Sequence, residues 1–366
     1  MIVVPTRAPL GWRGTVTACL VVGAAAMLVA GLFAASPSDG LGFDFRFQYF
    51  AGAESVLEGR SLYVTPDDPA LTGVKAYVYP PLLAIALVPF TVLPVDAAVI
   101  VALVGSIAAL MGAVAIAGVR DVRCHAALLL WAPAWNALEV VNLSATLALA
   151  VALVWRYRGE LWPLATVLGL AVAAKLFLWP LVIWAAATRG LRSAGLAAAV
   201  GLAATAAAWA VVGFDGFSGY PALLRRLAEI HAENSYSLVG IAAALGFEPP
   251  IGQVLMLIAG GALIAACVEL GRQGDERRAF TCAIVATLAL SPIVWQHYLV
   301  LLVVPLALRR PRFSAVWLLP VVLWLSPRAG DADGLEPFLP AFVVIAFLYV
   351  LLARPHSRVA AAEAAE

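Results

Sequence analysis

The chain has 366 residues, of which 63% are hydrophobic and 12% are charged, and its formal net charge is +1. This composition, with a mean hydropathy of +0.96, excludes a soluble globular protein and indicates a chain that crosses a membrane several times. The near-neutral charge argues against nucleic-acid binding and against a polybasic peripheral protein. The four cysteines are scattered in or beside apolar stretches, so they predict neither a disulfide framework nor a metal cluster.

Apolar stretches follow one another along almost the whole chain. The first, at 15–35, follows two arginines and is about 20 residues long, so it predicts a retained span rather than a cleaved signal peptide. Further stretches lie at 97–119, 124–138, 143–157, 161–178, 179–188, 193–213, 250–270, 279–291, 295–308, 313–326 and 338–353. Several are shorter than the ~20 residues of a straight span, so those must tilt, pair or be shielded by neighbours. The sequence therefore predicts an all-α polytopic membrane protein with about 11 to 13 transmembrane helices.

The basic residues set the expected orientation. If the N-terminus is cytoplasmic and the chain crosses at each stretch, one side receives 16 of the 23 lysines and arginines. The other side keeps Arg46, Arg60, Lys75, Lys175, Arg225, Arg226 and Arg328. This bias makes 36–79 and 214–249 extracytoplasmic loops. We expect them to belong to a single integral domain at 1–353 in the cell membrane, followed by a cytoplasmic tail at 354–366.

Two short apolar segments do not fit this alternation as crossings. Pro80–Pro94 is bounded by prolines, and a crossing there would reverse every later loop and remove the arginine bias. We therefore expect it, and the similar Leu238–Gly246, to lie in or dip into the outer interface.

The first long loop contains a helical pattern. Phe43, Phe47, Phe50 and Leu57 fall at helical spacing, and Gly59 follows as a C-terminal stop. This pattern predicts an amphipathic helix on the outer leaflet.

The second loop predicts another helix, from Pro221 to about Glu233. It carries Arg225 and Arg226, which face the outer side against the charge bias. Paired guanidinium groups suit a phosphate or an anionic headgroup, although simple attraction to anionic lipids is the plainer interpretation.

Asp44 comes soon after the first span. A carboxylate at the mouth of a membrane cavity can accept a proton from a sugar hydroxyl. The plainer interpretation is that Asp44 pairs with Arg46 or caps the helix that follows.

Lys175 and His297 are the basic groups placed most unusually. Lys175 lies deep in an apolar stretch, where a charge is expensive and suggests function, such as binding a lipid phosphate. Alternatively it snorkels to the outer interface. His297 lies between two apolar stretches on the outer side, where it can bind phosphate or assist proton transfer, or simply join an aromatic belt.

Other polar groups carry weaker signals. Glu139 and Asn142 lie between two stretches and can hydrogen-bond a sugar or be ordinary loop residues. Asp67 and Asp68 form an acidic pair, but no third ligand has a fixed spacing to them, so we expect no metal site. The sequence lacks a phosphate-cradling Gly loop, HExxH and GxSxG, which leaves nucleotide-driven transport and common hydrolase chemistry unsupported.

Five motifs nevertheless occur in a meaningful order. They are Asp44 with Tyr49, Ala51, Leu57, Gly59 and Tyr63; Tyr79-Pro80-Pro81-Leu82; Lys175 before Trp179-Pro180; Asn234-Ser235 before Ser237 and Gly240; and Ser291-Pro292 with Trp295 and His297. This ordered set, between about residues 39 and 310, resembles glycosyltransferase family 87. That family contains polyprenyl-phosphate-mannose-dependent α-mannosyltransferases of the GT-C class.

The resemblance implies a GT-C-like helical bundle with amphipathic helices in its outer loops. It implies that Asp44 is the general base and that Lys175 and His297, with Arg225 or Arg226, hold the donor phosphate. Contacts to sugar or acceptor would come from Tyr49, Tyr79, Asn142, Asn234 and Trp295. A hexose, by family default mannose, would pass by direct displacement with inversion from a polyprenyl-phosphate donor to a lipid-linked or cell-envelope glycan acceptor. Beyond these substrates and membrane lipids, the resemblance implies no cofactor and no metal.

Two other functions compete with this one. A transporter or flippase for lipid-linked sugars usually has polar groups at the midplane and an internal repeat. Here the polar groups gather at the outer interface and no repeat is visible. The hypothesis of a structural membrane protein without catalysis does not explain the first long loop, at 36–79, or Lys175.

Overall fold

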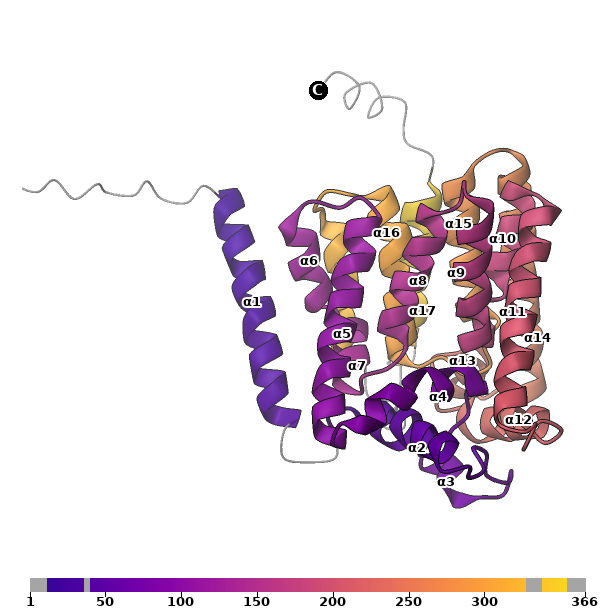
Figure 1. The fold of residues 1–366 in the computed structure, drawn as a ribbon. Helices are drawn as coiled ribbons and strands as arrows, with labels where there is room; N and C mark the ends of the chain where they lie inside the picture. The colour runs from indigo at the N-terminus through magenta and orange to yellow at the C-terminus, as the bar shows by residue number, and fades with distance from the viewer. Residues whose placement is uncertain (1–11, 36–39, 327–337, 354–366) are drawn as a thin grey trace, which may run out of the picture.

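The computed structural model describes residues 12–35, 40–326 and 338–353, and every regular element in these ranges is a helix (Figure 1). Arg7, Arg328 and the tail expected at 354–366 lie outside the described residues. The chain is an all-α polytopic membrane protein, as the composition predicts.

The bundle consists of apolar helices of very different lengths. The longer ones are α1 (Trp12–Ala35), α5 (Val95–Ile116), α11 (Leu191–Val211) and α14 (Pro249–Arg272). The shorter ones are α6 (Val122–Leu129), α7 (Ala132–Glu139), α8 (Ser144–Arg156), α9 (Leu161–Ala174), α10 (Pro180–Arg189), α15 (Glu276–Ala289), α16 (Val303–Arg309) and α17 (Phe338–Leu352). Three 3₁₀ segments belong to the same bundle, η3 (Leu176–Leu178), η4 (Gln296–Leu302) and η5 (Ala315–Leu325).

Length and composition alone qualify only some helices as membrane spans. In the described ranges α5, α11 and α14 pass this test, and α7 and α8 pass it as a pair bent by 119°. Shorter apolar helices of 10–17 residues, such as Leu161–Ala174 and Phe338–Leu352, make up much of the remainder. The number of 11 to 13 crossings therefore stays a prediction, because many stretches are broken or short.

Seven further elements gather at one end of the bundle, which we call the loop end (Figure 1). They are the π-helix η1 (Phe45–Phe50), α2 (Ala51–Leu57), α3 (Pro69–Thr72), α4 (Pro81–Leu87), η2 (Val88–Val92), α12 (Tyr220–His231) and α13 (Leu238–Ala244). Both helices expected from the loop patterns are present. Gly59 comes directly after Glu58, the C-cap residue of α2, and has a φ of +65°, which confirms it as the helix stop.

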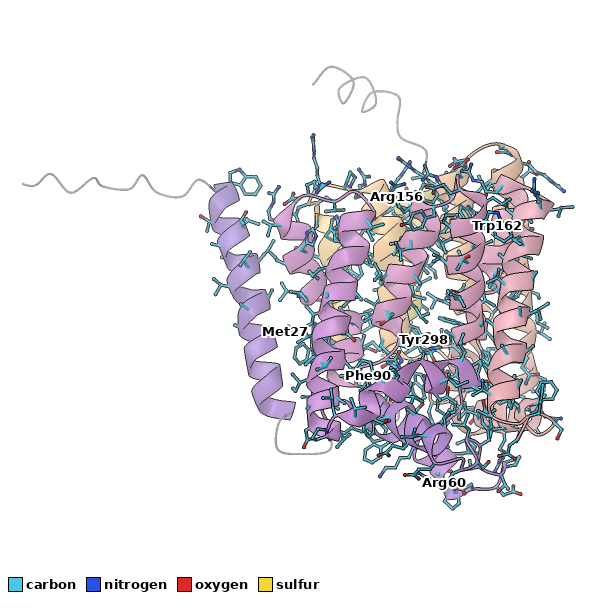
Figure 2. All side chains as sticks on the ribbon, viewed as in Figure 1. Met27, Arg60, Phe90, Arg156, Trp162 and Tyr298 are labelled. Atoms are coloured by element: carbon cyan, nitrogen blue, oxygen red, sulfur yellow. The ribbon has the colours of Figure 1, made fainter. Side chains whose placement is uncertain are left out.

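The opposite end carries Arg156 (Figure 2), and we call it the arginine end. Glu276 at the start of α15 accepts hydrogen bonds from both Arg158 and Arg189, and Arg309 donates to the carbonyl of Ala353. The described chain also begins at this end, with α1 (Figure 1). The folded chain thus sorts its basic residues as the alternation of apolar stretches predicts.

The two segments that resist the alternation both lie at the loop end. Pro80–Pro94 forms α4 and η2, which pack against α2, and Leu238–Gly246 forms α13 (Figure 1). Neither runs through the bundle, in agreement with the expectation that they do not cross.

A close helix crossing fixes the height at which α9 ends. A Cβ on Gly169 of α9 would lie 2.6 Å from the carbonyl oxygen of Ala197 in α11, and one on Gly201 would lie 3.1 Å from the carbonyl oxygen of Gly169. Only glycine allows backbones to approach so closely. The contact holds α9 firmly against α11, so that Lys175, the next residue after α9, has a defined position.

Candidate active site

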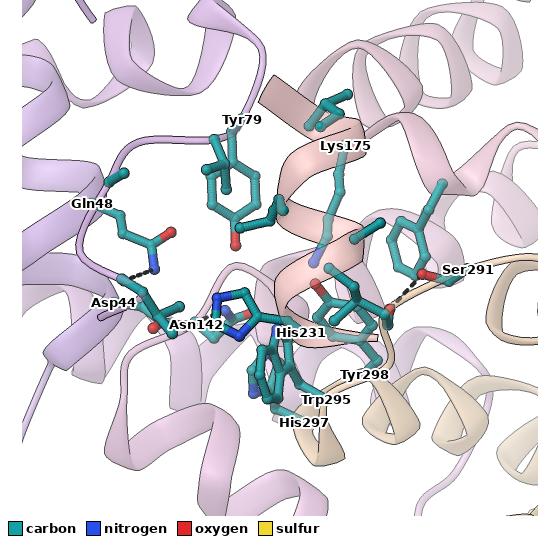
Figure 3. Close-up of a pocket in the computed structure, with 18 of the residues that line it drawn as sticks. Asp44, Gln48, Tyr79, Asn142, Lys175, His231, Ser291, Trp295, His297 and Tyr298 are labelled. Atoms are coloured by element: carbon teal, nitrogen blue, oxygen red, sulfur yellow. Dashed lines mark hydrogen bonds between the residues drawn. The ribbon is translucent and has the colours of Figure 1, made fainter. Parts of the chain in front are cut away.

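A cavity of about 470 Å³ opens at the loop end (Figure 3). Its walls come from segments that are far apart in the sequence. The polar or aromatic side chains that line it include Asp44, Gln48, Tyr79, Asn136, Asn142, Lys175, His231, Ser291, Trp295, His297 and Tyr298. The fold therefore brings together Asp44, Tyr79, Asn142, Lys175, Trp295 and His297 from the set selected by sequence.

The backbone before Asp44 is docked onto the turn between α7 and α8. The amide of Gly42 donates to the carbonyl of Glu139 at 2.7 Å, and the amide of Asp44 donates to that of Val140 at 3.1 Å. Gly42 has a φ of +73°, and a Cβ there would lie 2.8 Å from Cγ1 of Val99. Glycine is therefore required to bring the segment against α5 and the turn.

The carboxylate of Asp44 is buried, with 8% of the residue exposed, and accepts a hydrogen bond from Nδ2 of Asn142 at 2.5 Å. Burial raises its pKa to about 6, against the smaller lowering effects of the Asn142 hydrogen bond and the charge of Lys175. Arg46 instead forms an ion pair with Asp96 at 2.6 Å. In the described structure Asp44 makes no side-chain capping bond to η1, so the plainer interpretations of Asp44 are wrong.

Asn142 is held in one orientation. Its Oδ1 accepts hydrogen bonds from the amide and the hydroxyl of Ser144, both at 2.8 Å, so Nδ2 must face Asp44. Nδ2 also donates to the Tyr49 hydroxyl at 3.0 Å, which lies 3.2 Å from the Tyr79 hydroxyl. Tyr49 therefore does not line the cavity, but it hydrogen-bonds to Asn142 and Tyr79, which do.

Lys175 ends in an aromatic cage. Its Nζ lies 3.6 Å from the ring centroid of Tyr298, 4.8 Å from that of Phe177 and 5.5 Å from that of Tyr79. The Nζ atom is buried and has no hydrogen-bond partner among the described residues, and 8% of Lys175 is exposed. Lys175 therefore does not snorkel to the surface, and its Nζ points into the cavity (Figure 3).

His297 presents one free ring nitrogen. Its Nδ1 lies 2.9 Å from Oδ1 of Asn136, which can only accept, so Nδ1 carries the hydrogen. Its Nε2 is buried and has no partner in the described part of the chain. The ring packs edge-to-face on Tyr298, 4.9 Å between centroids. Lys175 and His297 therefore share an aromatic neighbour, and each leaves a nitrogen available to a ligand.

The remaining predicted contacts do not reach the cavity. Arg225, Arg226 and Asn234 are exposed and do not line it, and Arg226 pairs with Glu229 at 3.2 Å. This placement gives no support to a phosphate-binding role for the arginine pair. The amphipathic helix α12 turns its other face inward, where His231 contacts the carbonyl of Leu71 at 2.8 Å.

The lining residues that were not selected from the sequence include Gln48, Asn136, His231 and Tyr298. Gln48 follows Asp44 by one helical turn, and Tyr298 follows His297 directly. Their spacing from these two selected residues was the signal in the sequence that could have placed them in the site. His231 is on the predicted helix α12, but only its packing shows that this histidine, and not the arginine pair, faces inward. Of the acidic pair, Asp68 caps α3 by accepting a hydrogen bond from the amide of Ala70 at 2.8 Å.

Comparisons with known proteins point to one family. The model of glycosyltransferase family 87 matches residues 77–292. The polyprenol-phosphate-mannose-dependent alpha-(1-2)-phosphatidylinositol pentamannoside mannosyltransferase of Mycolicibacterium smegmatis is 26% identical over 299 residues, which cover 76% of this chain and 68% of that protein. No solved structure matches the chain. Because the family match covers more than half of the sequence, the chain belongs to glycosyltransferase family 87.

Proposed function

We propose that this membrane glycosyltransferase moves mannose from polyprenyl-phosphate mannose to a lipid-linked or cell-envelope glycan, at the extracytoplasmic face and with inversion. One observation carries the proposal. Two buried nitrogens that have no hydrogen-bond partner among the described residues, Nζ of Lys175 and Nε2 of His297, share a cavity with the buried carboxylate of Asp44.

Nζ of Lys175 suits the donor phosphate, and Nε2 of His297 suits it when the ring is doubly protonated. An uncompensated lysine in an apolar stretch costs about 2.5–3.5 kcal/mol on insertion scales, so an anion that meets it recovers much of that cost. When the bond between the anomeric carbon and the phosphate oxygen breaks, negative charge grows on the departing polyprenyl phosphate. Nζ of Lys175, already held over the ring of Tyr298, stabilises this charge without reorganising, and Nε2 of His297 donates a hydrogen bond to it when the ring carries a second proton.

Asp44 suits the role of general base. It takes the proton of the acceptor hydroxyl while the hydroxyl oxygen forms the new bond to the anomeric carbon. Figure 3 shows Asp44 and Lys175 on facing sides of the cavity. Attack from the Asp44 side, with departure toward Lys175, is an in-line displacement. It converts a β-linked donor into an α-linked product, and neither a metal nor a further cofactor takes part.

The choice of mannose and of the glycan acceptor rests on the Mycolicibacterium relative, whose name specifies a polyprenol-phosphate-mannose donor and a phosphatidylinositol pentamannoside. The extracytoplasmic side rests on the arginine end, which the positive-inside rule assigns to the cytoplasm. Family membership favours this transferase over the transporter and non-catalytic alternatives.

The test is direct transfer by the purified protein in detergent or liposomes. Polyprenyl-phosphate mannose is supplied with candidate mannosylated glycolipids, and products are read by mass spectrometry. We expect an acceptor that is heavier by one hexose and a new linkage that an α-mannosidase removes. A folded protein that transfers no hexose from this donor to any mannosylated glycolipid, or that yields a β-linked product, would contradict the proposal. Reactions without donor give the background.

A further inference from the structure

Gln48 is a buried cavity residue with no role in the chemistry described above. It lies in the π-helix η1, one turn after Asp44, and lines the same side of the cavity. π-helical segments are rare, and they occur mainly at functional sites.

The amide of Gln48 has a fixed orientation. Its Nε2 donates to the carbonyl of Val74 at 2.8 Å, and a backbone carbonyl can only accept. The side-chain oxygen, Oε1, must therefore point the other way. Figure 3 shows it on the cavity side, toward Tyr79. The atom is buried and has no hydrogen-bond partner among the described residues.

Val74 strengthens this arrangement. Its φ of 55° is in the left-handed region, which a β-branched residue avoids unless its surroundings impose it. The carbonyl of this strained residue accepts the hydrogen bond from Nε2 of Gln48. That hydrogen bond sets the direction of the side-chain oxygen of Gln48.

The chemistry of Oε1 of Gln48 determines which ligand groups it can bind. An amide oxygen accepts hydrogen bonds and repels phosphate oxygens, so it does not serve the donor phosphate. It shares a helix with Asp44, on the side from which the acceptor hydroxyl attacks, whereas Lys175 faces both from across the cavity (Figure 3). A sugar hydroxyl near Asp44 is the donor that suits it.

We propose that Oε1 of Gln48 accepts a hydrogen bond from an acceptor hydroxyl other than the one that Asp44 activates. Gln48 thereby determines which acceptor sugars, and which of their hydroxyls, are used. This inference rests on the proposed function and adds a specificity-determining residue to it.

The experiment compares the unaltered protein with Gln48→Leu, using polyprenyl-phosphate mannose and octyl α-D-mannopyranoside with its monodeoxy analogues as acceptor probes. The unaltered protein should lose about 3- to 10-fold in kcat/KM with at least one analogue beyond the one lacking the reactive hydroxyl. Gln48→Leu should lose a similar factor with the parent mannoside and no longer distinguish that analogue from it. The KM for the donor should stay unchanged.

A matched control is Gln253→Leu, the same exchange at an exposed position on α14 away from the cavity, which should change none of these ratios. If Gln48→Leu is less active but keeps every analogue penalty, Gln48 is only a tether for Val74 and the inference is wrong. Should Gln48→Leu fail to fold, Gln48→Asn retracts the amide by one methylene and must show the same loss of discrimination, or the inference is again wrong. Absence of any transfer by the unaltered protein instead contradicts the proposed function itself.

Discussion

The carboxylate of Asp44 is positioned by neutral partners. Asn142 donates to it, Ser144 orients Asn142, and Tyr49 receives the second hydrogen of the same amide. None of these groups carries a charge that would compete with the acceptor hydroxyl. A buried carboxylate held in this way remains basic, which is what a general base for a sugar hydroxyl requires.

A pH profile follows from this environment. Because the pKa of Asp44 is raised to about 6, the base is protonated and inactive below that pH and ionised above it. We expect kcat/KM to fall about tenfold per pH unit well below pH 6. His297→Gln should retain this acid limb despite its lower activity. A limb that disappears in His297→Gln would assign the titration to His297 instead.

The charge of Lys175 can be tested by Lys175→Met, which keeps the stem and removes the ammonium group. If Lys175 binds the donor phosphate, the donor kcat/KM should fall about 10- to 100-fold while the acceptor KM stays near its original value. His297→Ala should act in the same direction. The other lysine provides a control, because Lys75→Met removes an exposed lysine of the loop end that packs over Phe47, outside the cavity. Unchanged donor kinetics in Lys175→Met would remove Lys175 from the site.

The sequence indicated some of these residues and not others for physical reasons. Lys175 was visible because a charge in an apolar stretch needs a reason, wherever the chain folds. Arg225 and Arg226 looked equally suited to phosphate, but the packing of α12 turns them outward and His231 inward. Which face of an amphipathic helix meets a cavity depends on its neighbours, and one sequence does not supply them.

At the scale of elements, two short backbone features place Asp44 and Asn142. One is the close approach of Gly42 to Val99, and the other is the turn between α7 and α8, where Val141 has a φ of 50°. The helical spacing of apolar residues predicted a helix around Asp44 with its end at Gly59. It did not predict that the turn would dock on residue 42, because that contact is made between backbones and leaves no side-chain pattern.

The requirement for glycine at residue 42 is measurable. Gly42→Ala should lose about 1–2 kcal/mol for its positive φ and about 1–3 kcal/mol more for the clash with Val99. Gly59→Ala is the matched control, since Gly59 has a similar φ of +65° and no atom within 4 Å of the added Cβ. Thermal unfolding in detergent should therefore rank Gly42→Ala as the less stable variant. Equal stability of the two would show that the contact with α5 does not constrain the segment.

At the scale of the whole molecule, the arginine end and the loop end give the chain its polarity. This sorting was predictable, because the positive-inside rule acts on every loop and needs no tertiary contact. The number of crossings was not predictable from the sequence. Short helices follow one another across breaks such as the one at Lys175, and hydropathy sees each such pair as a single apolar stretch.

Topology is tested with single cysteines in a background without the four native ones. Cysteines at Ser61 and Ser218, both exposed at the loop end, should react with a membrane-impermeant maleimide on intact cells. Cysteines at Arg156 and Arg277, exposed at the arginine end, should react only after the membrane is opened. The reverse pattern would place the cavity on the cytoplasmic side.

The central claim is that Asp44 takes the proton of the acceptor hydroxyl in the cavity shared with Lys175 and His297. Asp44→Asn keeps the size and polarity of the side chain and removes its basicity. The decisive measurement is the single-turnover rate of hexose transfer from bound polyprenyl-phosphate mannose. We predict a rate about 10²- to 10⁴-fold lower than that of the unaltered protein, with donor affinity nearly unchanged. A folded Asp44→Asn protein that turns over at a near-normal rate would contradict the account.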